Sequence, residues 1–303
     1  NTFVNSYYVN GQLNLTVNPI LEFNQTASAI ACYTWPVNNV SYSLTGLYTY
    51  TTNNATTGCL ETYHLNVTVT PAVKMTGRVL LQGPYDEITG LMADSLRENG
   101  LIPNLEPYTA APYNKLFTLN EPASETVSNA VLNVTGNNAI VDWIFIELRS
   151  ATNPATVMYT KRALVQRDGD IVSSDDGVSP VYFTNAAAAN YYVAVKHRNH
   201  LGVMTATPVN FTNCGAVANA DFVSGAVWIS PSPSIFNSPR KAFGTVNTLW
   251  CADANNNKNL KYNGLSNDKD VIIQAVGMGT PNNILTLVYR TEDVNMDGRI
   301  KYN

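Results

Sequence analysis

The sequence predicts an all-β protein made of tandem antiparallel β-sandwich modules of the immunoglobulin-like or transthyretin-like kind. One observation is local: short runs of alternating apolar and polar residues are separated by turns rich in Gly, Pro and Asn. The other is a repeat. The segment QLNLTVNP at 12–19 returns as HLNVTVTP at 64–71. Repetition of a strand-like segment indicates successive copies of one small module.

The repeat also predicts where the modules begin and end. Each copy alternates Leu or Val with Asn or Thr and then stops at a proline, as the last strand of a module would. Residues 1–19 are therefore expected to be the end of a preceding repeat, and residues 20–71 one whole small module. We expect a main β-sandwich domain over 72–225 and a C-terminal β segment with two Asp-Asn loops over 226–303.

Three segments of the main domain have clear strand patterns. AIVDWIFIEL at 139–148 is apolar on both faces, which is typical of a central strand. VMYTKRALVQRDGDIV at 157–172 indicates two strands around a turn at Asp168 and Gly169. YYVAVKHR at 191–198 predicts a strand whose buried face is Tyr191, Val193, Val195 and His197. Only TGLMADSLRENG at 89–100 has a helical pattern.

Composition excludes two classes of partner. Only 13% of the residues are charged and the net charge is -4, so the chain lacks the clustered Lys and Arg of a nucleic-acid-binding protein. No stretch of about 18 apolar residues occurs, so no membrane-spanning helix is expected. A polar but nearly uncharged surface favours an extracellular protein.

The four cysteines form no CxxC pair, which argues against a zinc or thioredoxin-like site. In an exported protein we expect disulfides between sequence neighbours, Cys32 with Cys59 and Cys214 with Cys251. The alternative is four buried free thiols. A module of roughly fifty residues benefits from such a covalent link, because its hydrophobic core is small.

The segment DVNMDGRIKYN at 293–303 has the pattern of a calcium-binding loop. Side-chain oxygens would come from Asp293, Asn295 and Asp297, Gly298 would allow the sharp turn, and Arg299 would offer its backbone carbonyl. Ile300 would pin the loop onto the core. The alternative is a polar turn built from Asx-turn residues.

DANNNKNLKYN at 253–263 repeats this pattern. Its candidate ligands Asp253, Asn255 and Asn257 carry one formal charge, and Lys258 stands where the later copy has Gly298. Asp268 and Asp270 follow downstream and could add charge to either loop. Calcium is therefore the predicted cofactor, with even odds for this first loop. Affinities of about 0.1–1 mM are typical of extracellular modules, so the metal would stiffen the protein rather than sense calcium.

No catalytic constellation is evident. His197 and His200 occur as H-R-N-H without the HExxH glutamate, and on an extended segment they are expected to face opposite sides. His197 shares its face with Tyr and Val, so we interpret it as a satisfied core or rim histidine. There is no G-x-S-x-G sequence for a nucleophilic serine. We therefore expect no enzyme.

Several longer motifs occur together with the tandem DVNMDG-type elements: LLQGPYDEITGLMADSLRENGLIPNLEPY, VDWIFIELRSATNPATV, ALVQRDGDIV and YYVAVKHRNHLGVMT. Together they resemble the C-terminal region of large secreted cell-surface proteins of Bacteroidota, many of them exported by type IX secretion. The resemblance covers most of residues 72–303, and KHRNHLGVMT is its most specific piece. It implies an extracellular, adhesin-like or scaffold role at the cell surface.

Two functions are left open by the sequence. The first is a non-enzymatic structural or adhesin-like protein of a surface layer or filament, with like subunits, other cell-surface proteins or surface glycans as partners. The alternative is the anchoring or carbohydrate-binding tail of a secreted hydrolase. Its sugar platform would use exposed aromatic rings, with Trp35, Trp228 and Trp250 as the candidates.

Overall fold

A computed structural model describes residues 3–9, 12–18, 21–116, 124–229, 238–280 and 282–302. The protein is all-β and sandwich-type, as predicted, with strands in several sheets. The chain divides into two compact units. Unit 1 comprises residues 1–73, 184–188 and 213–216, and unit 2 comprises residues 74–183, 189–212 and 217–303. Residues 226–303 thus group with the main sheet in unit 2, whereas the sequence suggested a separate segment. Residues 1, 2, 10, 11, 19, 20, 117–123, 230–237, 281 and 303 of the predicted segments lie outside the described residues.

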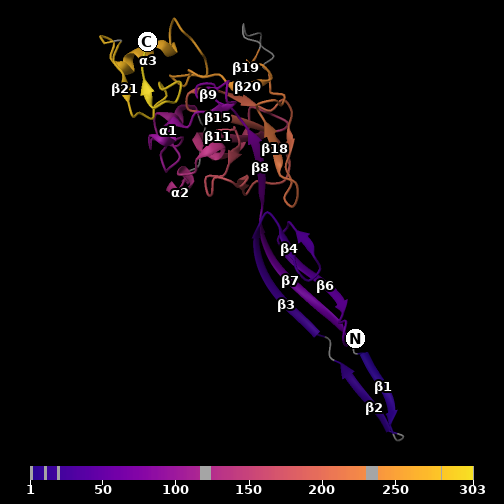
Figure 1. The fold of residues 1–303 in the computed structure, drawn as a ribbon. Coiled ribbons are helices and arrows are strands. Elements are labelled where there is room, and N and C mark those ends of the chain that lie inside the picture. Colours follow the sequence, from indigo (N-terminus) through magenta and orange to yellow (C-terminus); the bar gives the residue numbers. More distant parts are fainter. Residues whose placement is uncertain are drawn as a thin grey trace. The chain divides into compact units, whose positions relative to one another are not determined.

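The sheet of unit 1 has the strand order β3–β7–β6 (Figure 1). The strands are β3 (Leu21–Ile30), β6 (Gly46–Asn53) and β7 (Leu60–Thr70). β3 is parallel to β7, and β6 is antiparallel to it. A small hairpin joins β4 (Tyr33–Trp35) and β5 (Val40–Tyr42). The core cluster consists of Trp35, Leu65, Val67 and Val69, so the apolar positions of the repeated strand point inward.

The sequence repeat has a structural counterpart in two hairpins. β1 (Phe3–Val9) pairs antiparallel with β2 (Gln12–Asn18), which is the earlier copy of the repeated strand. Leu13 of β2 is registered with Tyr8, and Leu65 at the matching place in β7 is registered with Tyr48. Both copies therefore pair antiparallel with the strand that precedes them, and each places a tyrosine opposite the matching leucine.

The predicted disulfide pairing is wrong. Cys32 is bonded to Cys214, with their Cα atoms 5.4 Å apart. The prediction joined sequence neighbours, but residues 213–216 return to unit 1 and bring Cys214 to Cys32. Cys59 is buried, Cys251 is half-buried, and both are free thiols.

The main sheet of unit 2 has the order β13–β12–β11–β15–β16, and β17 also pairs with β15. The bounds are β11 (Ile140–Ser150), β12 (Val157–Gln166), β13 (Ile171–Val172), β15 (Asn190–His197), β16 (His200–Met204) and β17 (Val209–Asn210). Every residue of β11 from Ile140 to Leu148 is buried, which confirms the predicted central strand. The strand–turn–strand over 157–172 is also confirmed, with Gly169 at φ 93° in the turn.

A second sheet has the order β14–β8–β18, in which β8 and β18 are parallel. Hairpins β9–β10, β19–β20 and β21–β22 complete the strands. The bounds are β8 (Ala72–Arg78), β9 (Tyr85–Asp86), β10 (Leu91–Met92), β14 (Val181–Thr184), β18 (Ala218–Asp221), β19 (Arg240–Phe243), β20 (Val246–Leu249), β21 (Leu285–Thr286) and β22 (Arg299–Ile300).

The helices differ from the prediction. The expected helix over 89–100 is wrong for most of its length, because Leu91–Met92 forms β10 and only α1 (Ser95–Glu98) is helical. The longest helix, α3 (Asp268–Val276), was missed, although Asn267 caps it by accepting the Asp270 N–H. The shorter turns are α2 (Asn129–Leu132), η1 (Tyr113–Leu116) and η2 (Gly136–Asn138). Within the described residues, no helix is long and apolar enough to cross a membrane.

Candidate functional site

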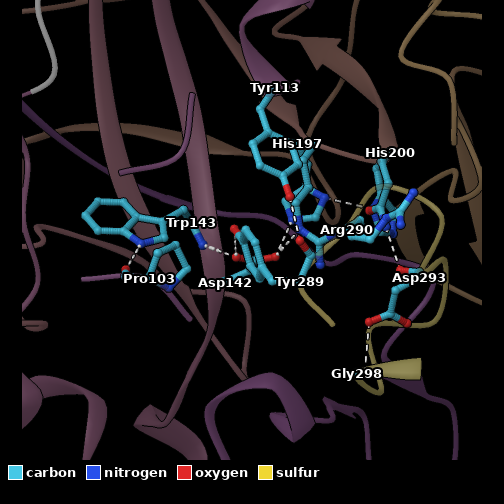
Figure 2. Close-up of polar contacts among 12 residues, drawn as sticks. Pro103, Tyr113, Asp142, Trp143, His197, His200, Tyr289, Arg290, Asp293 and Gly298 are labelled. Carbon is cyan, nitrogen blue, oxygen red and sulfur yellow. Dashed lines mark hydrogen bonds and ion pairs between the residues drawn. The ribbon is translucent and has the colours of Figure 1, made fainter. Parts of the chain in front are cut away.

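A tight turn between β15 and β16 brings His197 and His200 together inside unit 2. The two residues are register partners across the turn, and their Nδ1 atoms lie 3.0 Å apart (Figure 2). The expectation that they face opposite sides is therefore wrong, because the chain reverses at Arg198 and Asn199 instead of staying extended. His197 is 0% and His200 1% exposed, so the interpretation of His197 as a core histidine is confirmed.

Asp142 on β11 is the acceptor at the centre of this cluster (Figure 2). Its Oδ2 accepts from Nε2 of His197 at 3.1 Å and from Nε of Arg198 at 2.9 Å. Its Oδ1 accepts from the Tyr289 hydroxyl at 2.7 Å and from the Trp143 backbone N–H at 2.8 Å. Burial raises the pKa of this carboxyl, but Arg198 and His197 outweigh that effect and hold the pKa below its usual value. Asp142 is therefore a buried, ionised and fully hydrogen-bonded carboxylate.

The hydrogen bonds determine which histidine nitrogens carry protons. Nε2 of His200 accepts the Gly83 N–H at 3.2 Å, so the proton of this neutral ring is on Nδ1. That N–H is directed to Asn199 Oδ1 at 2.8 Å and to Nδ1 of His197. His197 then carries its own proton on Nε2 and donates it to Asp142. Burial lowers the pKa of both rings, most strongly that of His200. Both rings are therefore neutral, and hydrogen bonds to neighbouring groups hold each of them in place.

The same cluster fastens the segment that leads into the second Asp-Asn loop. Asn199 Nδ2 donates to the Asp293 carbonyl at 2.7 Å, and Arg198 donates to the Arg290 carbonyl. The Arg198 guanidinium also lies over the Tyr289 ring, 4.4 Å from its centroid. Gly83 allows close approach, because a Cβ there would lie 2.1 Å from the Val294 carbonyl oxygen. We call Asp142, His197, Arg198, Asn199, His200 and Tyr289 the anchor cluster.

The second loop, residues 293–300, folds around the Asp293 carboxylate. Oδ1 accepts the Asp297 N–H at 3.2 Å and Oδ2 accepts the Gly298 N–H at 2.9 Å. Asp297 in turn accepts the Arg299 N–H at 2.9 Å, and Asn295 Nδ2 donates to Asp297 at 2.9 Å. Burial is the main cause that raises the pKa of Asp293 to about 6. Ile300 is 0% exposed, so it pins the loop to the core as expected.

The first loop, residues 253–261, has the same construction. Asp253 accepts the N–H groups of Asn257 at 2.9 Å and Lys258 at 3.0 Å, and Asn257 accepts that of Asn259 at 2.9 Å. Burial raises the pKa of Asp253 to about 6 as well. Lys258 has φ 66° where Gly298 has φ 77°. The lysine therefore adopts the same left-handed conformation, and its presence does not change the loop.

Of the two downstream acids, only Asp268 joins the first loop. It is 4% exposed, and its carboxylate accepts the N–H groups of Lys261 at 2.8 Å and Asn255 at 3.4 Å. It also raises the pKa of Asp253 through charge repulsion, after burial. Asp270 instead accepts from Asn267 Nδ2 at 2.8 Å and completes the cap of α3. Asn255 and Asn257 both donate to the Ser266 carbonyl, which holds the loop against the segment that precedes α3.

The donor set of the loops fits a hard cation that prefers oxygen. Each loop supplies two carboxylates, and amide and backbone oxygens supplement them. A carboxylate or amide oxygen that accepts one N–H keeps a second lone pair for a metal. In the parts of the chain that the structure describes, no group of three or more His, Cys, Asp or Glu side chains is arranged to hold a metal. A site here would therefore depend on asparagine and carbonyl oxygens.

The anchor cluster was missed by sequence reasoning. Its signal was Asp142 in an otherwise apolar strand, because a charge buried in a central strand must find a partner. No protein-family model, curated protein or solved structure matches the chain.

Proposed function

We propose that this protein is a non-enzymatic, extracellular, adhesin-like structural protein of a cell-surface layer or filament, stiffened by calcium. One observation carries the proposal: the same loop geometry occurs twice. In each loop, one aspartate accepts the N–H groups of the residues four and five positions later. Anchor-cluster residues also hold the second loop, so ordering of that loop would be transmitted to the main sheet.

Calcium would be held by Asp293, Asn295, Asp297 and the Arg299 carbonyl in the second loop. In the first loop the ligands would be Asp253, Asn255, Asn257 and Asp268. When bound, the ion supplies a compact double positive charge beside carboxylates that burial makes costly to ionise. Asp253 and Asp293, whose pKa is raised to about 6, are the residues that would gain most.

Two further features support an extracellular structural role. The Cys32–Cys214 disulfide is typical of an oxidising compartment. Both copies of the repeated strand pair antiparallel with the strand before them, and such repetition is typical of tandem modules, which build extended proteins from nearest-neighbour contacts. Like subunits or other cell-surface proteins are the proposed partners.

The experiment is electron microscopy of the native secreted material, first with calcium and then after EDTA. Ordered fibres or sheets that fray in EDTA are the expected result. Dispersed particles under both conditions, with the same melting temperature, would contradict the proposal.

The alternative function is a carbohydrate-binding tail of a secreted hydrolase. Of the three tryptophans predicted for its sugar platform, only one is placed to contact a ligand. Trp35 is 0% exposed and donates from Nε1 to Gln25 at 2.8 Å, so it belongs to the core of unit 1. Trp250 is half-buried and donates from Nε1 to the Ser238 carbonyl. Trp228 is 38% exposed and lines a hollow in unit 2. That hollow is the observation that favours glycan binding.

A further inference from the structure

The hollow beside Trp228 has a volume of about 640 Å³, within the range of about 300–1,000 Å³ that is usual for small-molecule sites. Strand β16 lines it from His200 to Met204, and residues 153–155 of the β11–β12 turn line it as well. Most of its lining surface is apolar, with a few charged groups. A site of this kind binds a ligand that has one apolar face and one charged group.

Trp228 offers a preformed apolar surface at this hollow. Its backbone N–H donates to the Met204 carbonyl at 2.8 Å. Its ring packs edge-to-face on Tyr192, with centroids 5.6 Å apart and planes at 88°. Because the backbone and the ring are both held, little conformational freedom is lost when a ligand packs on it. The C–H face of a pyranose ring is suited to such a surface.

Three cations converge on the same hollow, Arg149, Lys196 and Lys258. Glu147, 1% exposed, accepts hydrogen bonds from Arg149 and Lys196, and Arg149 also donates to the Pro154 carbonyl at 3.0 Å. Glu147 lies behind these cations and does not line the hollow. Among the described lining residues Asp253 is the acid, and its two oxygens accept the N–H groups of its own loop. Three positive groups therefore face two carboxylates, which leaves an excess of positive charge.

The excess of positive charge affects the pKa of Lys196. Burial lowers its pKa, Arg149 and Lys258 lower it further, and Glu147 acts in the opposite direction. A bound anion would relieve the repulsion among the three cations. The charges therefore suit a ligand that packs against the Trp228 ring and places a negative group beside the three cations.

We propose that this hollow binds a carboxylate-bearing saccharide, with its sugar ring against Trp228 and its carboxylate toward Lys258, Arg149 and Lys196. The inference does not depend on the filament role, since assembly does not enter it, and calcium held at Asp253 would only add to the positive charge of the hollow. A saccharide is favoured over a peptide C-terminus because the cations lie beside a rigid aromatic wall, and the outer edge of β16 is already hydrogen-bonded at Leu201 and Met204 to the backbone of Trp250 and Trp228.

The test is calorimetric titration of the full chain with tetragalacturonic acid and with its methyl ester, which has the same shape without the charge. Trp228→Ala should weaken binding of the acid at least tenfold, a loss of about 1.4 kcal/mol. Lys258→Asn removes one cation and keeps a residue that tolerates the left-handed conformation, and should weaken binding by roughly threefold to tenfold. Tyr262→Ala and Lys241→Asn are the matched controls, an exposed aromatic and a cation that do not line the hollow.

Each outcome decides the proposal, provided that near-ultraviolet circular dichroism shows intact folding. Tight binding of the acid, weaker binding of the ester and loss in both hollow variants support it. Equal binding of acid and ester overturns it, as does unchanged binding in Trp228→Ala. Binding of tetra-alanine with a free carboxyl terminus, without binding of either saccharide, also overturns it and assigns the hollow to a peptide partner.

Discussion

Asp142 and Arg198 form an ion pair inside unit 2, with 2.9 Å between Oδ2 and Nε and no exposed side-chain surface on either residue. Burying such a pair is costly unless the remaining lone pairs and N–H groups are also satisfied. Three further donors complete the Asp142 carboxylate. The Arg290 carbonyl accepts from Arg198 Nη1 and the Tyr289 ring lies against the guanidinium, whereas Nη2 of Arg198 has no hydrogen-bond partner among the described residues. The pair therefore joins β11, the β15–β16 turn and the C-terminal loop segment.

Replacing Asp142 by Asn should destabilise the protein by about 3–5 kcal/mol, because Arg198 would remain buried without its counter-charge. Urea unfolding measures the change. The matched control is Asp170→Asn, which breaks an exposed pair with Arg78 at 3.6 Å and should cost less than about 1 kcal/mol. Equal effects of the two variants would show that the anchor cluster contributes no special stability.

The contribution of the two buried histidines to stability should fall as the pH decreases below the ordinary histidine pKa of 6.5. Burial lowers the pKa of His197 and His200 from that value, so the unfolded chain binds protons that the folded protein does not. This contribution is complete above pH 6.5 and declines below it, by up to about 1.4 kcal/mol per pH unit for each ring.

His200→Gln isolates this effect, since Asp253 and Asp293, with pKa raised to about 6, act in the opposite sense. Urea unfolding at several pH values should show a smaller pH slope in the variant. An unchanged slope would mean that His200 does not titrate on unfolding.

Calcium should stabilise unit 2 through the two loops. With a dissociation constant of about 0.1–1 mM, about 10 mM calcium adds roughly 1.4–2.7 kcal/mol to the free energy of unfolding for each occupied loop. Asp293→Asn should abolish the calcium-dependent stabilisation that comes from the second loop, and Asp253→Asn should abolish the part that comes from the first loop. Asp270→Asn, an acid of the α3 cap, is the control. Equal stabilisation by magnesium, or by calcium in both loop variants, would count against the sites.

Gly298 and Lys258 occupy equivalent left-handed positions, so reciprocal substitutions should have opposite effects. Lys258→Gly should stabilise by roughly 0.5–1 kcal/mol, because glycine adopts this conformation without strain. Gly298→Ala should destabilise by about 1–3 kcal/mol, since its Cβ would also lie 2.8 Å from Leu101 Cδ1. Gly264→Ala, at φ 92° with nothing within 4 Å, measures the conformational part alone. The packing argument would be contradicted if denaturant unfolding showed a larger loss of stability for Gly264→Ala than for Gly298→Ala.

Peptide mapping without reduction should recover one cross-linked fragment, containing Cys32 and Cys214. Cys32→Ser should destabilise unit 1 by about 3–5 kcal/mol, because the closed loop is long. Cys59→Ser, at a free thiol, should have a much smaller effect. A recovered Cys32–Cys59 fragment would show that the pairing of sequence neighbours was right after all.

Strands and loops whose contacts are local were predictable. The continuous apolar run of β11 and the turn at Gly169 are determined by side-chain alternation and by backbone freedom. The Asp-Asn loops were predictable for a similar reason, because Asp253 and Asp293 bond N–H groups only four and five residues away. Calcium binding by those loops stays a prediction.

Only the tertiary structure decided which distant residues meet. Asp142 bonds Tyr289 across 147 residues of sequence, and Cys32 bonds Cys214 across 182. The sequence left open which loop Asp268 would join, and the structure assigns it to the first loop because it lies at the start of α3, beside that loop. Local patterns carry no record of such contacts, since they depend on how whole sheets pack and on where buried charges find their partners. Sequence thus determined the strands and the loop chemistry, and packing determined the site that holds them together.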